Sequence, residues 1–366
     1  MLDKTHVAIV HQFDPYADVL DISAYGSGHI NDTFLVLTQV GRPDYILQRV
    51  NHQVFRDVPK LMDNIVRVTT HIQHKLSPLP EGQIENRCLT VIPCVTGLPY
   101  FQDELGQYWR MYFHIAEGRS FDLVTSPDLA YEGGKAFGEF QRCVADLPSP
   151  PLHETIPNFH HIDLRLAKLF DAIETDPHNR VQQVREECRF VVENRNEMRL
   201  VLQLGLAGKI PLRVTHNDTK FNNVLLDQTG KGLCVIDLDT VMPGYVHYDF
   251  SDSIRTVTNT ALEDEKDLSK VSMDIDLFEA FSEGFFSSVL PSLTMQEKLS
   301  LPEAVGLLPF IIGVRFLTDF LEGDIYFKTQ YPEHNLQRAK VQFELVKSIQ
   351  AQQADIERIF TRIMGG

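Results

Sequence analysis

Residues 214–226 read Val-Thr-His-Asn-Asp-Thr-Lys-Phe-Asn-Asn-Val-Leu-Leu, a polar segment that ends in an apolar run. A turn sequence, Asp227-Gln-Thr-Gly230, comes next, followed by a second apolar segment, Gly232-Leu-Cys-Val-Ile-Asp237-Leu-Asp239. This order predicts a loop, a strand, a turn and a second strand. Because a hairpin returns the chain to its start, we expect the polar loop to lie beside Asp237.

The side chains in these two segments suit phosphoryl transfer from a nucleotide. A carboxylate such as that of Asp218 orients an attacking hydroxyl. Its ordinary pKa of about 3.9 is acceptable because a loose transition state depends more on positioning than on strong proton abstraction. Asp and Asn oxygens are hard ligands that Mg²⁺ prefers, and a lysine stabilises charge on the transferred group. Their order and spacing around two apolar strands indicate a kinase.

The sequence resembles the aminoglycoside phosphotransferase/choline kinase superfamily over essentially its whole length. The resemblance rests on His216-Asn-Asp-Thr-Lys-Phe-Asn-Asn-Val-Leu-Leu226 and Val235-Ile-Asp-Leu-Asp-Thr-Val-Met-Pro-Gly244, which are most similar to N-acetylhexosamine 1-kinases. It implies an α+β, protein-kinase-like fold of two lobes. We expect a strand-rich N-terminal nucleotide-binding lobe at residues 1–115 and a helix-rich C-terminal catalytic and sugar-binding lobe at residues 116–366.

The same resemblance implies the activity and the roles of the motif residues. The expected reaction is transfer of a phosphoryl group from ATP, with Mg²⁺ as cofactor, to the anomeric (C1) hydroxyl of N-acetylglucosamine or N-acetylgalactosamine. Asp218 is then the catalytic base, and Lys220 the cation beside it. The implied metal ligands are Asn223 and Asp237, with Asp239 as a further candidate for the metal or substrate shell.

The nucleotide-binding residues are expected in the first third of the chain. Glycines permit close backbone approach to phosphates, and the loop Tyr25-Gly-Ser-Gly-His29 supplies Gly26, Ser27 and Gly28. Kinases place a phosphate-binding lysine on the third strand, but the candidate strand reads Tyr45-Ile-Leu-Gln-Arg-Val50. Strand alternation puts Gln48 and Arg49 on opposite faces, and we favour Arg49 because a guanidinium suits phosphate oxygens. In the alternative, Arg49 pairs with Asp57 at the surface.

The acceptor-binding residues are expected in the C-terminal region and in the glycine-rich loop. Resemblance to hexosamine kinases suggests sugar contacts from Arg315, Tyr326 and His29. A guanidinium donates several hydrogen bonds to hydroxyls or to an acetamide carbonyl, and a tyrosine adds an apolar face. In the alternative, Arg315 pairs with Asp319 one turn on, and Tyr326 is a core residue.

Residue periodicity predicts the elements around these motifs. Strands are expected at Thr33–Thr38, Tyr45–Val50 and Cys88–Cys94, and Trp109–Ile115 is a further short apolar segment. Helices are expected at Pro59–His74, Tyr131–Asp146, Val181–Leu202 and over much of the chain from residue 270.

Composition limits the partners. The 34 Lys and Arg against 50 Asp and Glu give a net charge of −16, which disfavours nucleic acid as a partner. We expect only a small sugar and a nucleotide, bound with a strong dependence on Mg²⁺. The five cysteines lack a Cys-x-x-Cys pair, and the apolar run Ala304–Val314 is shorter than a membrane span. With no basic leader at the N-terminus, these features predict a cytoplasmic protein without a membrane partner. The oligomeric state stays open.

Two rival functions remain open. A kinase of the same fold has other acceptors, such as choline, homoserine, methylthioribose or an aminoglycoside. Choline favours an aromatic cage, for which Trp109 is the single indole, and aminoglycosides favour clustered acids. A catalytically silent kinase-like binding module agrees with the missing strand lysine but not with the intact Asp218, Asn223 and Asp237.

Overall fold

The computed structural model describes residues 4–26, 30–79 and 84–365, and the chain forms two compact units. Unit 1 contains Met1–Ser120, Cys143–Pro157 and Val224–Pro243; unit 2 contains Phe121–Arg142, Asn158–Asn223 and Gly244–Gly366. These units differ from a single division after residue 115, because two later segments join the N-terminal part. The assignment of one function to each predicted lobe stays a prediction.

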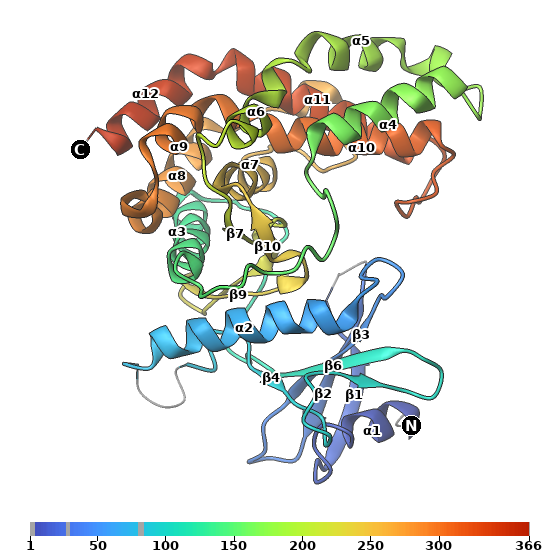
Figure 1. The fold of residues 1–366 in the computed structure, drawn as a ribbon, viewed down its shortest axis with the longest axis vertical. Coiled ribbons are helices and arrows are strands. Elements are labelled where there is room, and N and C mark those ends of the chain that lie inside the picture. The colour runs from blue at the N-terminus through green and yellow to red at the C-terminus, as the bar shows by residue number, and fades with distance from the viewer. Residues whose placement is uncertain (1–3, 27–29, 80–83, 366) are drawn as a thin grey trace. The chain divides into compact units, whose positions relative to one another are not determined.

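Unit 1 contains an antiparallel sheet (Figure 1). Its order is β1-β2-β3-β6-β4, and β5 pairs with β6. The strands are β1 (Val19–Ala24), β2 (Asp32–Thr38), β3 (Tyr45–Val50), β4 (Val91–Ile92), β5 (Phe101–Gln102) and β6 (Tyr108–Phe113). The predicted strands at 33–38 and 45–50 are confirmed. The predicted strand at 88–94 is wrong in length, since only its centre pairs with β6.

Strand alternation gives the two faces of this sheet different partners. On one face, Leu47 and Met111 pack against the helix α1 (Lys4–Val10) in a core of buried apolar side chains. The opposite face carries Gln48 and Arg110, which are register partners on β3 and β6. Arg110 there reaches Met62 of α2 (Val58–Leu76), the helix predicted from the spacing of its apolar residues.

Two short strands at the end of unit 1 form the predicted hairpin. β8 (Val224–Leu226) pairs antiparallel with β9 (Gly232–Val235), and Val224 is the partner of Val235. Asp237 therefore follows β9 at the end of the hairpin where β8 begins. Its backbone is left-handed, with φ of 58°, and a 3-10 turn at Leu238–Thr240 leads to β10 (Met242–Gly244). Such a conformation is unfavourable for a residue with a side chain and requires local support.

Unit 2 is mainly helical, as predicted for the C-terminal part. Its helices are α3 (Pro127–Val144, whose last residues belong to unit 1), α4 (Ile162–Thr175), α5 (Arg185–Asn194), α6 (Leu200–Leu206), α7 (Val246–Val257), α8 (Ile275–Val289), α9 (Met295–Ser300), α10 (Leu307–Leu321), α11 (His334–Ala351) and α12 (Gln353–Met364). A short strand, β7 (Arg213–Thr215), and a 3-10 turn at Phe221–Asn223 flank the polar loop.

The predicted helix at 181–202 is wrong, because the chain breaks there into shorter pieces. A 3-10 turn at Val181–Val184 precedes α5, and a second at Glu197–Arg199 separates α5 from α6. The α5 helix ends at Asn194, whose side-chain amide donates to the Phe190 carbonyl at 2.8 Å. Asparagine side chains that bond to nearby backbone compete with continued helix formation.

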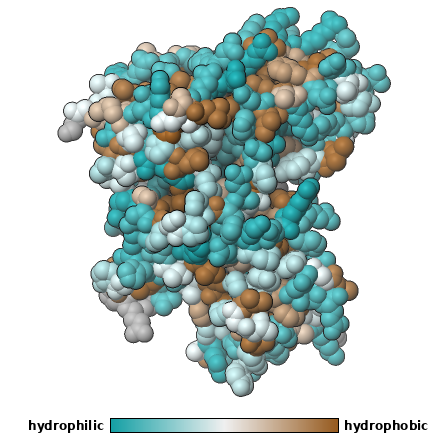
Figure 2. Space-filling model, viewed as in Figure 1, coloured by the Kyte–Doolittle hydropathy of each residue, from teal (hydrophilic) through white to brown (hydrophobic). Residues whose placement is uncertain are grey.

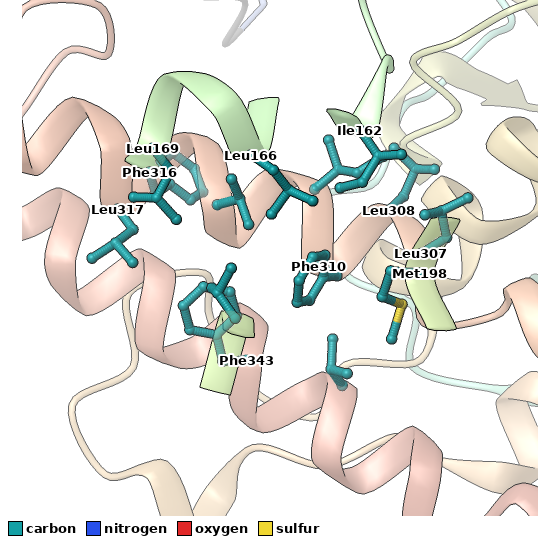
Figure 3. Close-up of a cluster of buried hydrophobic side chains, with 14 of the residues drawn as sticks. Ile162, Leu166, Leu169, Met198, Leu307, Leu308, Phe310, Phe316, Leu317 and Phe343 are labelled. Atoms are coloured by element: carbon teal, nitrogen blue, oxygen red, sulfur yellow. The ribbon is translucent and has the colours of Figure 1, made fainter. Parts of the chain in front are cut away.

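The main core of unit 2 lies between α4, α10 and α11 (Figure 3). Leu166, Leu317 and Phe343 are among the buried side chains that meet there. The segment Pro302–Leu321, which includes α10, is long and apolar enough for a membrane span, but 89% of an 18-residue window in it is buried inside the protein. Its composition is therefore that of a core helix. On the face drawn in Figure 2, hydrophobic residues are interspersed among hydrophilic ones.

Candidate active site

The loop that contains Asp218 is held by α7. Asp249 of this helix accepts hydrogen bonds from the backbone N–H of His216 at 2.8 Å and of Asn217 at 2.7 Å. Its own backbone carbonyl accepts from the Thr219 hydroxyl at 2.6 Å. Asn217 is left-handed, with φ of 64°, so the chain turns sharply immediately before Asp218. Asp249 therefore supports this loop through three hydrogen bonds.

Asp218, Lys220 and Asn223 lie together in unit 2. Lys220 Nζ is 3.1 Å from Asp218 Oδ2, and Asn223 Nδ2 donates to the Asp218 carbonyl at 2.8 Å. Burial alone would raise the pKa of the Asp218 carboxyl, but the charges of Lys220, His216 and Arg255 outweigh it and hold that pKa below its usual value. The carboxylate is thus ionised at neutral pH and can accept a hydrogen bond from a hydroxyl.

The predicted magnesium ligands fit this ion by their chemistry. Because the amide nitrogen of Asn223 is directed at Asp218, the Oδ1 atom of Asn223 faces away from Asp218 and can serve as an oxygen ligand to a metal ion. Asp237 in unit 1 offers a carboxylate, and Mg²⁺ takes such oxygens with water and phosphates in the remaining positions. In the part of the chain that the structure describes, no group of three or more His, Cys, Asp or Glu side chains could hold a metal ion. Asn223 and Asp237 stay the predicted ligands.

Asp239 is a buried anchor within unit 1. Its Oδ1 atom pairs with Arg110 Nη1, its Oδ2 atom accepts from Asn31 Nδ2 at 2.6 Å, and its carbonyl accepts from the Thr155 hydroxyl at 2.9 Å. Both carboxylate oxygens are therefore engaged by protein groups. These contacts give Asp239 a structural role within unit 1, and its place in the metal or substrate shell stays a prediction.

Arg110 is the residue of unit 1 that sequence reasoning missed. Its side chain is buried, and its Nε atom donates to Gln48 Oε1 at 2.9 Å. Burial alone would lower the pKa of Arg110, but the Asp239 carboxylate raises it, so the guanidinium stays charged. A signal existed in the sequence, since Arg110 is the one charge within the apolar strand Tyr108–Phe113 and a buried charge requires a partner.

Arg49 lies on the opposite face of the sheet from Arg110. It pairs with Asp32, its register partner on β2, and its side chain is 45% exposed. The alternative pairing with Asp57 is wrong, because Asp57 caps α2 and pairs with Lys60. Gly26 has φ of 76°, a conformation that favours glycine, whereas Ser27, Gly28 and His29 lie outside the described residues.

Arg315 and Tyr326 are neighbours in unit 2, as the predicted acceptor site requires. The guanidinium carbon of Arg315 lies 5.6 Å from the centre of the Tyr326 ring and 5.4 Å from that of Phe327. Asp319 does not take the alternative role of partner to Arg315, since its carboxylate accepts the backbone N–H groups of Ile325, Tyr326 and Phe327. Tyr326 is 58% exposed and is not a core residue.

Comparison with known proteins gives the chain a family and a fold. The model of the phosphotransferase enzyme family matches residues 21–268, a range that includes Asp218, Asn223 and Asp237. An aminoglycoside phosphotransferase from Alicyclobacillus acidocaldarius is similar over 97% of this chain and 96% of its own, with a TM-score of 0.62 and 14% identity. A choline kinase from Cryptosporidium parvum covers 97% of this chain and 98% of its own, with a TM-score of 0.59 and 15% identity. An ADP-bound aminoglycoside phosphotransferase covers 95% and 99%, with a TM-score of 0.52 and 12% identity. The predicted kinase-like α+β fold is confirmed.

Proposed function

The chain belongs to the phosphotransferase enzyme family, and from this premise we propose that it is an ATP-dependent kinase of N-acetylhexosamines. The observation that carries the proposal is the Asp218 carboxylate, ionised beside Lys220 and Asn223 in the same unit as Arg315 and Tyr326. The product would be the sugar 1-phosphate, formed with ADP.

In the proposed reaction, Asp218 accepts a hydrogen bond from the C1 hydroxyl of the sugar and orients its oxygen. As the bond between this oxygen and the γ-phosphorus forms, the bond from that phosphorus to the β–γ bridging oxygen breaks, and the hydroxyl proton passes to Asp218. Lys220 stabilises negative charge close to the carboxylate. Asn223 and Asp237 would hold Mg²⁺, which supplies charge neutralisation for the phosphates. In this mechanism Asp218 does not need to be a strong base, in agreement with its lowered pKa.

The acceptor contacts are proposed from the chemistry of two side chains. The Arg315 guanidinium has several N–H donors for sugar hydroxyls or an acetamide carbonyl, and the exposed ring of Tyr326 offers an apolar surface to the sugar ring. His29 is retained as a proposed contact from sequence resemblance alone. For the nucleotide, Gly26, Ser27 and Gly28 are retained on the same ground, and Arg49 is retained because a guanidinium suits phosphate oxygens.

The decisive experiment incubates the purified full chain with ATP, Mg²⁺ and N-acetylglucosamine or N-acetylgalactosamine. Phosphorus NMR then assigns the position of the transferred phosphate. Turnover of neither sugar, with turnover of another acceptor, would contradict the proposed substrate but not the family.

A matched pair of variants tests the role of Asp218. Asp218→Asn keeps the size of the side chain but removes the carboxylate, and we expect turnover to fall at least a hundredfold, in line with the effect of losing a positioned base. Asp227→Asn changes an exposed carboxylate in the β8–β9 turn and should keep near-normal turnover. Circular dichroism checks that both variants are folded. Equal activity of the two variants would reject the role of Asp218.

A further inference from the structure

A second guanidinium, that of Arg165 on α4, lies close enough to Arg315 for their charges to interact. Its Nε and Nη2 atoms donate to the carbonyl of Phe159 at 3.3 and 2.8 Å. On the same residue, the ring of Phe159 lies 5.2 Å from the guanidinium carbon of Arg315. Phe159 therefore holds one arginine through its carbonyl and the other through its ring.

The neighbouring residue, His160, connects these arginines to the Asp218 loop. Its Nε2 atom lies 3.0 Å from the carbonyl oxygen of Asn217, the residue before Asp218, and its ring is buried. Burial and the nearby charges of Arg315 and Arg165 lower the pKa of His160 to about 3, although the Asn217 carbonyl opposes this. His160 is therefore neutral at physiological pH, and both cations act on a residue that contacts the loop.

Arg165 and Arg315 differ from Arg110 of unit 1, whose charge is neutralised by a carboxylate. Within the described residues, no carboxylate forms an ion pair with Arg165 or Arg315, and the Arg165 bonds to Phe159 leave its Nη1 atom without a protein partner. Burial and the charge of Arg315 lower the pKa of Arg165 to about 10, which still leaves it charged at neutral pH. Arg165 and Arg315 are thus two cations without a paired carboxylate in the described residues, in addition to Lys220 and Arg255, whose charges act on Asp218.

We infer that Arg165 is a specificity-determining residue, which together with Arg315 excludes acceptors that carry a positive charge. The inference rests on the proposed function, since it concerns the acceptor of the Asp218 site. Guanidinium groups that lack a neutralising partner repel a cation and attract a carbonyl oxygen or an anionic group. The acceptor class is therefore a neutral polyhydroxyl compound, with an amide or other oxygen-rich substituent and no ammonium group.

Glucose and glucosamine form a pair that isolates charge, because they differ only in a hydroxyl or an ammonium group at C2. We expect the full chain at a pH where the amine is protonated to favour glucose over glucosamine in kcat/KM and in the dissociation constant from calorimetry. In Arg165→Gln that preference should fall about tenfold, the effect of one like charge at a partly exposed site. Arg165→Lys should keep it.

Lys168→Gln is the matched control, because Lys168 lies on the same helix but is exposed and paired with Glu322. Its glucose-to-glucosamine preference should equal that of the wild type. An unchanged preference in Arg165→Gln, or a wild type that favours glucosamine, would overturn the inference. A general loss of fold would instead weaken both sugars equally, and Arg165→Lys separates this case from loss of charge.

A different set of results is expected if the protein is not a kinase of N-acetylhexosamines. If no sugar is bound or phosphorylated, the comparison is repeated with choline and its uncharged carbon analogue 3,3-dimethylbutan-1-ol. Preference for choline would reject both proposals. Preference for the analogue, or turnover of methylthioribose, would reject the N-acetylhexosamine as acceptor and retain the exclusion of cations.

Discussion

The Arg110–Asp239 pair of unit 1 and the two arginines Arg165 and Arg315 of unit 2 differ in how their charges are compensated. In unit 1, the Asp239 carboxylate meets the Arg110 guanidinium, and Asn31 and Gln48 occupy the remaining positions around the pair. In unit 2, the Asp249 carboxylate is held by amide donors, while Arg165 and Arg315 contact carbonyl and aromatic groups. A neutralised pair stabilises structure, but unneutralised charges beside a reactive carboxylate are available to a ligand. Charges that lack a protein partner are therefore the better guide to the proposed site.

The largest expected effect tests whether the unit 1 pair is structural. Arg110→Met would leave Asp239 buried without its cation, which should lower the free energy of unfolding by about 3–5 kcal/mol, measured by urea denaturation. Arg49→Met, which removes the exposed partner of Asp32, should lower it by less than about 1 kcal/mol. Similar losses in both variants would remove the distinction between a buried and an exposed pair.

Asp249 is a buried carboxylate that is held by amide donors and not by a guanidinium, and it should make the free energy of unfolding depend on pH. Burial raises the pKa of Asp249 to about 6 from the ordinary 3.8, although His216, its N–H and that of Asn217 oppose this. Because the folded protein then binds this proton more tightly, the group stabilises the fold below pH 4 and loses that contribution as pH rises through 6. The wild type should therefore lose roughly 3 kcal/mol relative to Asp249→Asn between these limits.

Denaturation by urea at a series of pH values measures this difference. Asp227→Asn serves as the control, since that carboxylate is exposed and its pKa is lowered by its bonds to Thr229 and the Lys231 N–H. A difference between wild type and Asp249→Asn that stays constant with pH, or that grows above pH 6, would contradict the assignment.

A smaller effect is expected from Arg315, and on binding more than on stability. Arg315→Met removes donors for the acceptor, so KM for N-acetylhexosamine should rise about 10- to 100-fold, as for the loss of a charged hydrogen bond. The free energy of unfolding should change by less than about 1 kcal/mol, because the substitution also removes the repulsion between Arg315 and Arg165. Arg338→Met removes another arginine over a ring, that of Phe316, and should leave KM unchanged. Equal KM values in the two variants would contradict the contact.

The smallest expected effect concerns the acid limb of the pH–rate profile. Lys220 helps to hold the pKa of Asp218 below its usual value, so Lys220→Met should raise that pKa. The acid limb of kcat/KM should then move upward by roughly one pH unit. Lys60→Met, in an exposed pair with Asp57, should not move it. A limb that shifts downward in Lys220→Met would show that another group controls it.

The sequence predicted the parts of the fold whose pattern is local. The strands β2 and β3 and the helix α2 follow from residue periodicity, and the β8–β9 hairpin follows from its turn residues. The short strand β1 was missed, because four of its six residues are exposed and leave little apolar alternation.

The candidate site was predicted only where residues cluster along the chain. Asp218, Lys220 and Asn223 are close in sequence and in space, whereas Arg165 contributes through Phe159 and His160, which no spacing rule connects to residue 218. The partner of Arg110 is 129 residues away, so the pair cannot be found by periodicity. Long-range pairs of this kind depend on tertiary packing, which one sequence does not reveal.

The separation between Arg110 and Asp239 also has a consequence for protein synthesis. At about 5–20 residues per second, a ribosome needs roughly 6–26 seconds to add the 129 residues that separate them. During this time the strand that carries Arg110 has no Asp239 to pair with, and the β8–β9 hairpin that completes unit 1 has not been made. Unit 1 therefore cannot finish folding ahead of the following segments, and the nascent chain must keep the charge of Arg110 hydrated until residue 239 emerges.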